Sequence, residues 1–163
     1  MDRRARVICL TITSPDEAAT GALAAALARQ CVNGDCLLLS GDLGAGKTVF
    51  ARGFIRALTD ERMEIVSPTF TLLQTYPIEG GVISHFDLYR LRSPEELMEI
   101  GLEDALSQGI TLIEWPEMAR NFTPSGALEI GIRMGGAAEE RVIEFSGAAE
   151  VWQDRLEKMT FLN

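Results

Sequence analysis

The sequence CLLLSGDLGAGKT, residues 36–48, decides the fold of this chain. Its four leading residues, Cys36 to Leu39, are all apolar, which is typical of a strand buried on both faces of a parallel sheet. A glycine-rich segment follows, and beyond it apolar side chains recur at helical spacing from Phe50 to Leu58. The stretch therefore predicts a buried strand, a glycine loop and a helix, in that order.

The glycine-rich segment, the P-loop, matches the phosphate-binding pattern G-x-x-x-x-G-K-[ST] in full. Its members are Gly41, Asp42, Leu43, Gly44, Ala45, Gly46, Lys47 and Thr48. The glycines permit backbone angles that other residues disfavour, so consecutive N–H groups of the loop and of the helix start can bind anionic oxygens. Lys47 is predicted to reach the β- and γ-phosphates of a nucleotide, and the Thr48 hydroxyl to bind magnesium. The alternative, a glycine-rich turn with a coincidental Lys-Thr, is disfavoured by the strand before it and the helix after it.

The rest of the chain alternates between strand and helix patterns. Strands are expected at residues 6–12, 70–77, 82–89, 110–113, 128–134 and 142–145, and helices from Ser14 to about Gln30, from Ser93 to near Ile100 and through Trp152, Leu156 and Met159. The first two helices begin with Ser-Pro-x-Glu, in which serine is expected to be the N-cap and proline the first helical residue. The strands at 70–77 and 82–89 should form one hairpin. The strands at 128–134 and 142–145 should form another, at a sheet edge. The chain of 163 residues is expected to be one α/β domain, residues 1–163.

The composition limits the classes of function. The chain has 15 Lys and Arg against 24 Asp and Glu, a net charge of −9. This balance argues against a protein that grips nucleic acid by itself, because neutralising phosphates requires clustered basic side chains. The three cysteines have no paired spacing, which argues against a disulfide framework or a zinc site. Without a signal-peptide pattern or a membrane-length apolar run, the expected location is the cytoplasm.

An ATPase also needs an acidic side chain near the metal ion, usually at the end of a neighbouring buried strand. Two positions qualify: Asp87 follows residues 82–86, and Glu114 follows residues 110–113, the more apolar of the two runs. Either carboxylate can hold magnesium, directly or through water, and either can orient the attacking water. An exposed carboxylate without a role is the alternative for each one taken singly.

Three more side chains are candidates in this region. His85, the only histidine, lies on the same face of its strand as Asp87. It is either an acid–base group or a histidine satisfied by local hydrogen bonds. Thr69 and Thr71 precede the first hairpin, where many P-loop proteins have a loop that senses the γ-phosphate. The alternative for both is an ordinary strand threonine.

Four segments together resemble one family. They are GDLGAGKT at 41–48, SPTFTL at 67–72, HFDLYRL at 85–91 and IEWPE at 113–117. In this order they resemble the bacterial TsaE (YjeE) family, the small P-loop ATPase of the machinery that makes threonylcarbamoyladenosine in tRNA. The resemblance extends from about Pro15 to Trp115. It implies a P-loop NTPase-like three-layer fold, with a mainly parallel central sheet extended by antiparallel hairpins.

The resemblance also implies a ligand, a set of site residues and partners. The ligand is ATP with Mg²⁺. The implied site residues are Thr48 and Glu114 as the metal pair, Asp87 as a residue needed for hydrolysis, Thr69 in a switch-like loop, Trp115 near the nucleotide or the partner surface, and Arg141 near the nucleotide. The implied partners are the proteins TsaB and TsaD. ATP turnover would reset this pair between rounds of transfer, and tRNA would be contacted only through the complex.

Two other classes of function share the P-loop. A small-molecule kinase needs an acceptor pocket and often an arginine-bearing lid, but residues 93–110 contain no Arg or Lys. A nucleotide-gated binding module would share every site residue and differ only in turnover, and the chain alone is expected to hydrolyse ATP weakly. GTP is disfavoured as the ligand because the sequence has no Asn-Lys-x-Asp segment.

Overall fold

A computed structural model describes residues 5–161 of the chain. Its strands are β1 (Val7–Ser14), β2 (Cys36–Ser40), β3 (Leu73–Ile78), β4 (Gly81–Asp87), β5 (Gly109–Glu114), β6 (Leu128–Met134) and β7 (Arg141–Ala148). Its α-helices are α1 (Glu17–Ala28), α2 (Lys47–Leu58), α3 (Glu96–Glu99), α4 (Leu102–Gln108) and α5 (Ala149–Phe161), with short 3-10 helices η1 (Pro116–Met118) and η2 (Arg120–Phe122). None of the helices within this described part is both long and apolar enough to cross a membrane.

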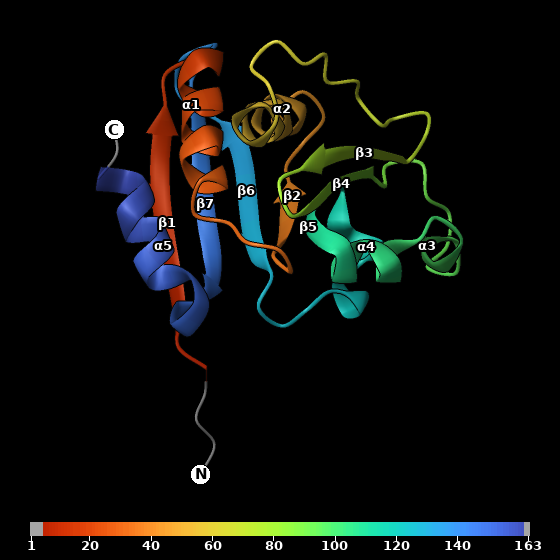
Figure 1. The fold of residues 1–163 in the computed structure, drawn as a ribbon. Coiled ribbons are helices and arrows are strands. Elements are labelled where there is room, and N and C mark those ends of the chain that lie inside the picture. Colours follow the sequence, from red (N-terminus) through yellow and green to blue (C-terminus); the bar gives the residue numbers. More distant parts are fainter. Residues whose placement is uncertain (1–4, 162–163) are drawn as a thin grey trace.

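The strands form a seven-stranded sheet in the order β1-β7-β6-β2-β5-β4-β3 (Figure 1). Its centre, β6-β2-β5-β4, is parallel throughout, whereas β3 and the pair β7 and β1 are added antiparallel at the two sides. The predicted parallel centre with antiparallel additions is therefore confirmed. The expectation that the second hairpin forms a sheet edge is wrong, because β1 pairs with β7 along its whole length and forms that edge instead.

Helices cover both faces of the sheet, which confirms the predicted three layers. The larger apolar cluster joins one face of the sheet to side chains of α1, α2 and α5, and a second cluster joins the other face to α3, α4 and Ala119. Strand β2 contributes to both clusters: Leu37 and Leu39 belong to the first, while Cys36 and Leu38 belong to the second. Strand β2 is therefore buried on both faces, as its four apolar residues predict.

Several boundaries differ from the sequence prediction, among them those of β1, α1 and β3. Ser14 ends β1, and the N-cap of α1 is Asp16, whose side chain accepts a hydrogen bond of 2.8 Å from Ala19 N. The Ser14 hydroxyl is used elsewhere, in a buried contact of 2.7 Å with Thr20 Oγ1. Strand β3 begins at Leu73 rather than at residue 70.

The segment after Ser93 forms two short helices instead of one. Helix α3 ends near Ile100, where the sequence predicted an end, but the chain resumes as α4 after Gly101. Gly101 has a φ of +82°, a left-handed conformation that glycine adopts without steric cost. The turn at this glycine lets both Leu97 and Leu102 reach the same apolar cluster.

Helices α1 and α2 approach each other through two glycines. A Cβ atom added to Gly53 would lie 2.7 Å from the Cα and the carbonyl oxygen of Gly21, whereas a Cβ on Gly21 would meet nothing within 4 Å. We expect Gly53→Ala to lower the free energy of unfolding by about 1–3 kcal/mol, because the two helices must separate. Gly21→Ala should leave it unchanged or raise it by up to about 1 kcal/mol, since alanine is the better helix former.

Urea unfolding followed by circular dichroism measures both variants under the same conditions. The two substitutions add the same methyl group to a helix, so any difference between them reports the contact between the helices. Equal stability of the two variants would contradict the close packing described above.

Candidate nucleotide site

The P-loop connects the end of β2 to the start of α2. Gly46 is the N-cap of α2 with a φ of +112°, and Gly41 has a φ of +148°, both in the range that favours glycine. A Cβ atom on Gly41 would lie 2.3 Å from the carbonyl oxygen of Ile132 in β6. Both positions therefore require glycine for their backbone angles. Gly41 requires it also for its close approach to the neighbouring strand.

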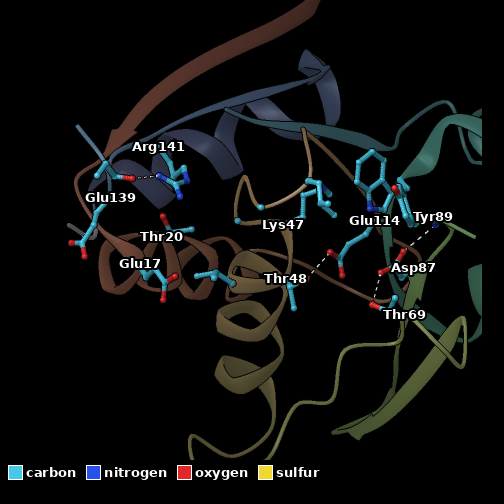
Figure 2. Close-up of a pocket in the computed structure, with 16 residues that line it drawn as sticks. Glu17, Thr20, Lys47, Thr48, Thr69, Asp87, Tyr89, Glu114, Glu139 and Arg141 are labelled. Carbon is cyan, nitrogen blue, oxygen red and sulfur yellow. Dashed lines mark hydrogen bonds between the residues drawn. The ribbon is translucent and has the colours of Figure 1, made fainter. Parts of the chain in front are cut away.

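A cavity of about 410 Å³ lies beside this loop (Figure 2). Of the predicted residues, Leu43, Gly44, Gly46, Lys47, Thr48, Thr69, Asp87, Glu114, Trp115 and Arg141 line it. The other three P-loop residues, Gly41, Asp42 and Ala45, do not line the cavity, and neither do the candidates Thr71 and His85. The fold thus brings residues from five separate stretches of the sequence to one place.

Lys47 points back onto the loop itself. Its Nζ atom donates hydrogen bonds to the carbonyl oxygens of Gly41 at 2.6 Å and Asp42 at 2.9 Å, and lies 4.0 Å from the centre of the Trp115 ring. The residue is only 5% exposed. Burial lowers its pKa below the usual lysine value of 10.5, while the nearby Glu114 and Asp87 carboxylates oppose this shift. An anion bound in the loop would offer this ammonium group a better partner than neutral carbonyls.

Thr48 and Glu114 are in direct contact. The Thr48 hydroxyl donates a hydrogen bond of 3.0 Å to Oε1 of Glu114, which ends β5 beside β2 and is 2% exposed (Figure 2). Hydroxyl and carboxylate oxygens are ligands that Mg²⁺ prefers, so this pair fits the ion. No cluster of three or more His, Cys, Asp or Glu side chains suited to a metal occurs within residues 5–161. The remaining ligands would have to come from a nucleotide and from water, as is usual for Mg²⁺ in such sites.

Asp87 lies next to Glu114 but has other partners. The parallel register of β4 and β5 places the two residues opposite each other at the ends of their strands. Asp87 Oδ1 accepts a hydrogen bond of 3.0 Å from Tyr89 N, and Oδ2 accepts one of 3.2 Å from the Thr69 hydroxyl. The geometry therefore separates the two candidate carboxylates: Glu114 contacts Thr48, and Asp87 contacts the loop before β3.

Thr69 lies in a turn and not in a strand. Its hydroxyl also lies 2.8 Å from that of Ser67, so a short chain of hydroxyl groups leads from the loop to Asp87. Thr71 is in the same turn and accepts a hydrogen bond from Gln74. The interpretation of both as ordinary strand threonines is therefore wrong, and Thr69 is the one that contacts the site.

Trp115 and Arg141 both line the cavity and contact the P-loop. Trp115 has a left-handed backbone, with a φ of +56°, and its ring lies between Lys47 and Tyr89, 4.7 Å from the Tyr89 ring centre. Arg141 Nε donates a hydrogen bond of 2.8 Å to the carbonyl oxygen of Ala45. Its Nη1 is held by the carbonyl oxygens of Ala138 and Glu140, so Arg141 braces the P-loop from the start of β7.

Sequence reasoning missed several lining residues. Glu17 and Thr20 reach the cavity from α1, and Ala138 and Glu139 reach it from the turn before β7. Glu17 belongs to the Ser-Pro-x-Glu helix start and Thr20 to the helix after it, and that pattern predicts a helix but no ligand site. The second pair lies in a Gly- and Ala-rich turn without a recognisable motif. Val49 directly follows the P-loop and Tyr89 lies within the quoted HFDLYRL segment, so these two are the missed residues for which a signal existed.

A parallel sheet, a P-loop between β2 and α2, and an acidic strand end beside the loop threonine define an α/β protein of the P-loop NTPase-like class. Comparisons with known proteins agree. A family profile described as "Threonylcarbamoyl adenosine biosynthesis protein TsaE" matches residues 14–143. The tRNA threonylcarbamoyladenosine biosynthesis protein TsaE of Rickettsia felis is 38% identical over an alignment of 153 residues that covers 87% of this chain and 90% of the relative.

Two matches come from Bacillus subtilis. The protein of the same name there is 35% identical over 153 residues, covering 92% of this chain and 91% of the relative. A crystal structure of Bacillus subtilis YdiB superposes with a TM-score of 0.78 and 31% identity, covering 95% of this chain and 96% of that one. This chain therefore belongs to the TsaE family, whose role lies in the biosynthesis of threonylcarbamoyladenosine in tRNA.

Proposed function

We propose that this chain binds ATP with Mg²⁺, hydrolyses it weakly alone, and acts on a TsaB–TsaD pair between rounds of threonylcarbamoyl transfer. The contact between Thr48 and Glu114 inside the P-loop cavity is the observation that carries this proposal. It places two oxygen donors suited to Mg²⁺ beside backbone N–H groups suited to phosphate. The absence of an Asn-Lys-x-Asp segment from the sequence supports ATP over GTP.

Each of the following cavity residues has its own role in the proposed hydrolysis. Loop N–H groups bind the phosphate oxygens, and the Lys47 ammonium moves from the loop carbonyls to the β- and γ-phosphates. Thr48 and Glu114 hold the magnesium ion, which neutralises charge on the phosphates when bound. Asp87 accepts a proton from, or orients, the attacking water, and its bond to Thr69 couples this position to the loop at residues 67–72.

The partners follow from the family and from the charge of the chain. A net charge of −9 suits a subunit that does not bind tRNA itself, so that other proteins of the complex bind it. We therefore propose that tRNA is reached only through the TsaB–TsaD pair, and that one domain spanning residues 1–163 performs the ATPase function. The three cysteines are free thiols, which supports a reducing compartment such as the cytoplasm.

The test is Mg-ATP hydrolysis by the purified chain, alone and with the TsaB–TsaD pair, with Lys47→Ala as the blank. We expect slow turnover alone and a stimulation of about tenfold or more by the pair, because partner proteins commonly complete such sites. ATP binding without stimulation would contradict the role in the complex and favour a nucleotide-gated binding module. Phosphate transfer to an added small-molecule acceptor, instead of to water, would favour a kinase.

A further inference from the structure

His85 holds the second oxygen of the carboxylate that contacts Thr48. The imidazole is fully buried in β4, and its Nε2 atom lies 2.6 Å from Oε2 of Glu114. The other carboxylate oxygen, Oε1, accepts the hydrogen bond from Thr48. Glu114 is thus fixed at both oxygens, by a histidine on one side and by the loop threonine on the other.

The strand register explains how a residue of β4 reaches the end of β5. His85 pairs with Leu112, two residues before Glu114, so the imidazole and the carboxylate are diagonal neighbours on one face of the sheet. This face is the one covered by α2, because Leu112 belongs to the cluster that contains α2 side chains. The contact is therefore built by two central strands and not by a loop.

The hydrogen bonding of the imidazole indicates a role directed at Glu114. Because a carboxylate only accepts, Nε2 is the donor, and the Nδ1 atom has no partner among the described residues. Burying an imidazole with one unpaired nitrogen is less favourable than burying an apolar side chain of similar size. If this position served packing alone, an apolar side chain would stabilise the core better than histidine.

We propose that His85 is a positioning residue that keeps Oε1 of Glu114 aimed at Thr48 and at the divalent cation of the bound nucleotide. The inference rests on the proposed function, because it assumes that the cation binds between these two residues. Replacing a side chain that holds a metal-binding carboxylate in place typically lowers metal affinity 10- to 100-fold. A purely structural histidine would instead alter stability and leave the cation dependence unchanged.

The test compares nucleotide affinity with and without the cation. Fluorescent ATP-analogue titrations in excess Mg²⁺ and in EDTA give the factor by which Mg²⁺ tightens binding, which requires no turnover. We expect His85→Leu and His85→Asn to lower this factor by about tenfold, the smaller end of the range above, with the affinity in EDTA unchanged. His85→Gln should retain most of it, because its amide nitrogen reaches the position of Nε2, whereas the shorter asparagine falls short.

Two controls separate the possible outcomes. In a Glu114→Gln background, His85→Asn should have no further effect on the Mg²⁺ factor, since the two residues act through one contact. As His85 is the only histidine, its ring nitrogens can be assigned by NMR, and Nε2 should carry the proton.

Four results would overturn the inference. They are a Mg²⁺ factor unchanged in His85→Asn and His85→Leu, an equal loss of affinity in EDTA, failure of His85→Gln to rescue while folded, and an Nε2 atom that carries no proton. If the unaltered protein binds the analogue equally well with Mg²⁺ and with EDTA, the proposed function itself fails, and this inference fails with it.

Discussion

Lys47→Ala is expected to lower the Mg-ATP turnover of this protein by about 10²- to 10³-fold, the range seen when one preorganised donor to developing charge is removed. Lys47 is the cation at the head of α2 and is 5% exposed. Its two hydrogen bonds go to loop carbonyl oxygens, which a phosphate group would replace as partners. Without it, the site loses the one ammonium group that is proposed to contact the β- and γ-phosphates.

The sequence supplies a matched control, because Lys158 is the only other lysine. Lys158 lies exposed near the end of α5, away from the cavity residues. Lys158→Ala should leave turnover within about twofold of the unaltered protein, since a lone exposed charge contributes little. Both variants are measured in the presence of the partner pair, and a thermal scan checks that Lys47→Ala is folded. Retained turnover in folded Lys47→Ala would contradict the assignment of the site.

Gly109→Ala should destabilise the fold more than either Gly53→Ala or Gly21→Ala. A Cβ atom at Gly109 would lie 1.9 Å from the carbonyl oxygen of Val82 and 2.8 Å from its nitrogen. These atoms belong to the backbone of β4 and cannot rotate away. We expect a loss of about 3 kcal/mol or more, the upper end for overpacking, which lowers the melting temperature of a protein this size by about 6–12 °C.

Gly131→Ala is the matched control, because Gly131 is also a strand glycine in the parallel part of the sheet. A Cβ there would lie 3.9 Å from the Ser40 hydroxyl oxygen, which is an ordinary contact. Differential scanning calorimetry of the two variants should show a large shift for Gly109→Ala and a shift of under about 3 °C for Gly131→Ala, as expected below 1 kcal/mol. Similar melting temperatures for the two variants would show that the β4–β5 backbone can adapt.

The Gly109 prediction also concerns the site. The β4–β5 register runs from Val82 opposite Gly109 to Asp87 opposite Glu114. A methyl group that forces the first pair apart changes the alignment of the last. The ATPase activity of Gly109→Ala is therefore expected to fall with its stability, whereas Gly131→Ala retains both.

The sequence predicted the elements with strong local signals and misplaced those without them. The β2–P-loop–α2 unit is correct because apolar runs, positive-φ glycines and helical spacing are all local properties. The N-cap of α1 was assigned two residues early, because the Ser14 hydroxyl contacts Thr20 and Asp16 caps instead. Helix α4 was missed because a seven-residue helix after a glycine leaves too short a pattern to recognise.

The second hairpin illustrates a different limit. The alternation in residues 128–134 and 142–145 correctly indicated two paired strands, β6 and β7. Their place in the sheet depends on β1, which is over a hundred residues away in the sequence and supplies the outer edge. No local pattern encodes which strand becomes the edge, because the pairing of β1 with β7 joins residues far apart in the sequence.

By itself, the sequence determined the P-loop, the parallel strand before it and the two candidate carboxylates, since each follows from residue types within a few positions of one another. Only the tertiary structure decided that Glu114 contacts Thr48, that Asp87 contacts Thr69, and that His85 holds Glu114. These contacts join residues 18 to 66 positions apart. They depend on the parallel register of β2, β5 and β4, which brings the strand ends to one edge of the sheet.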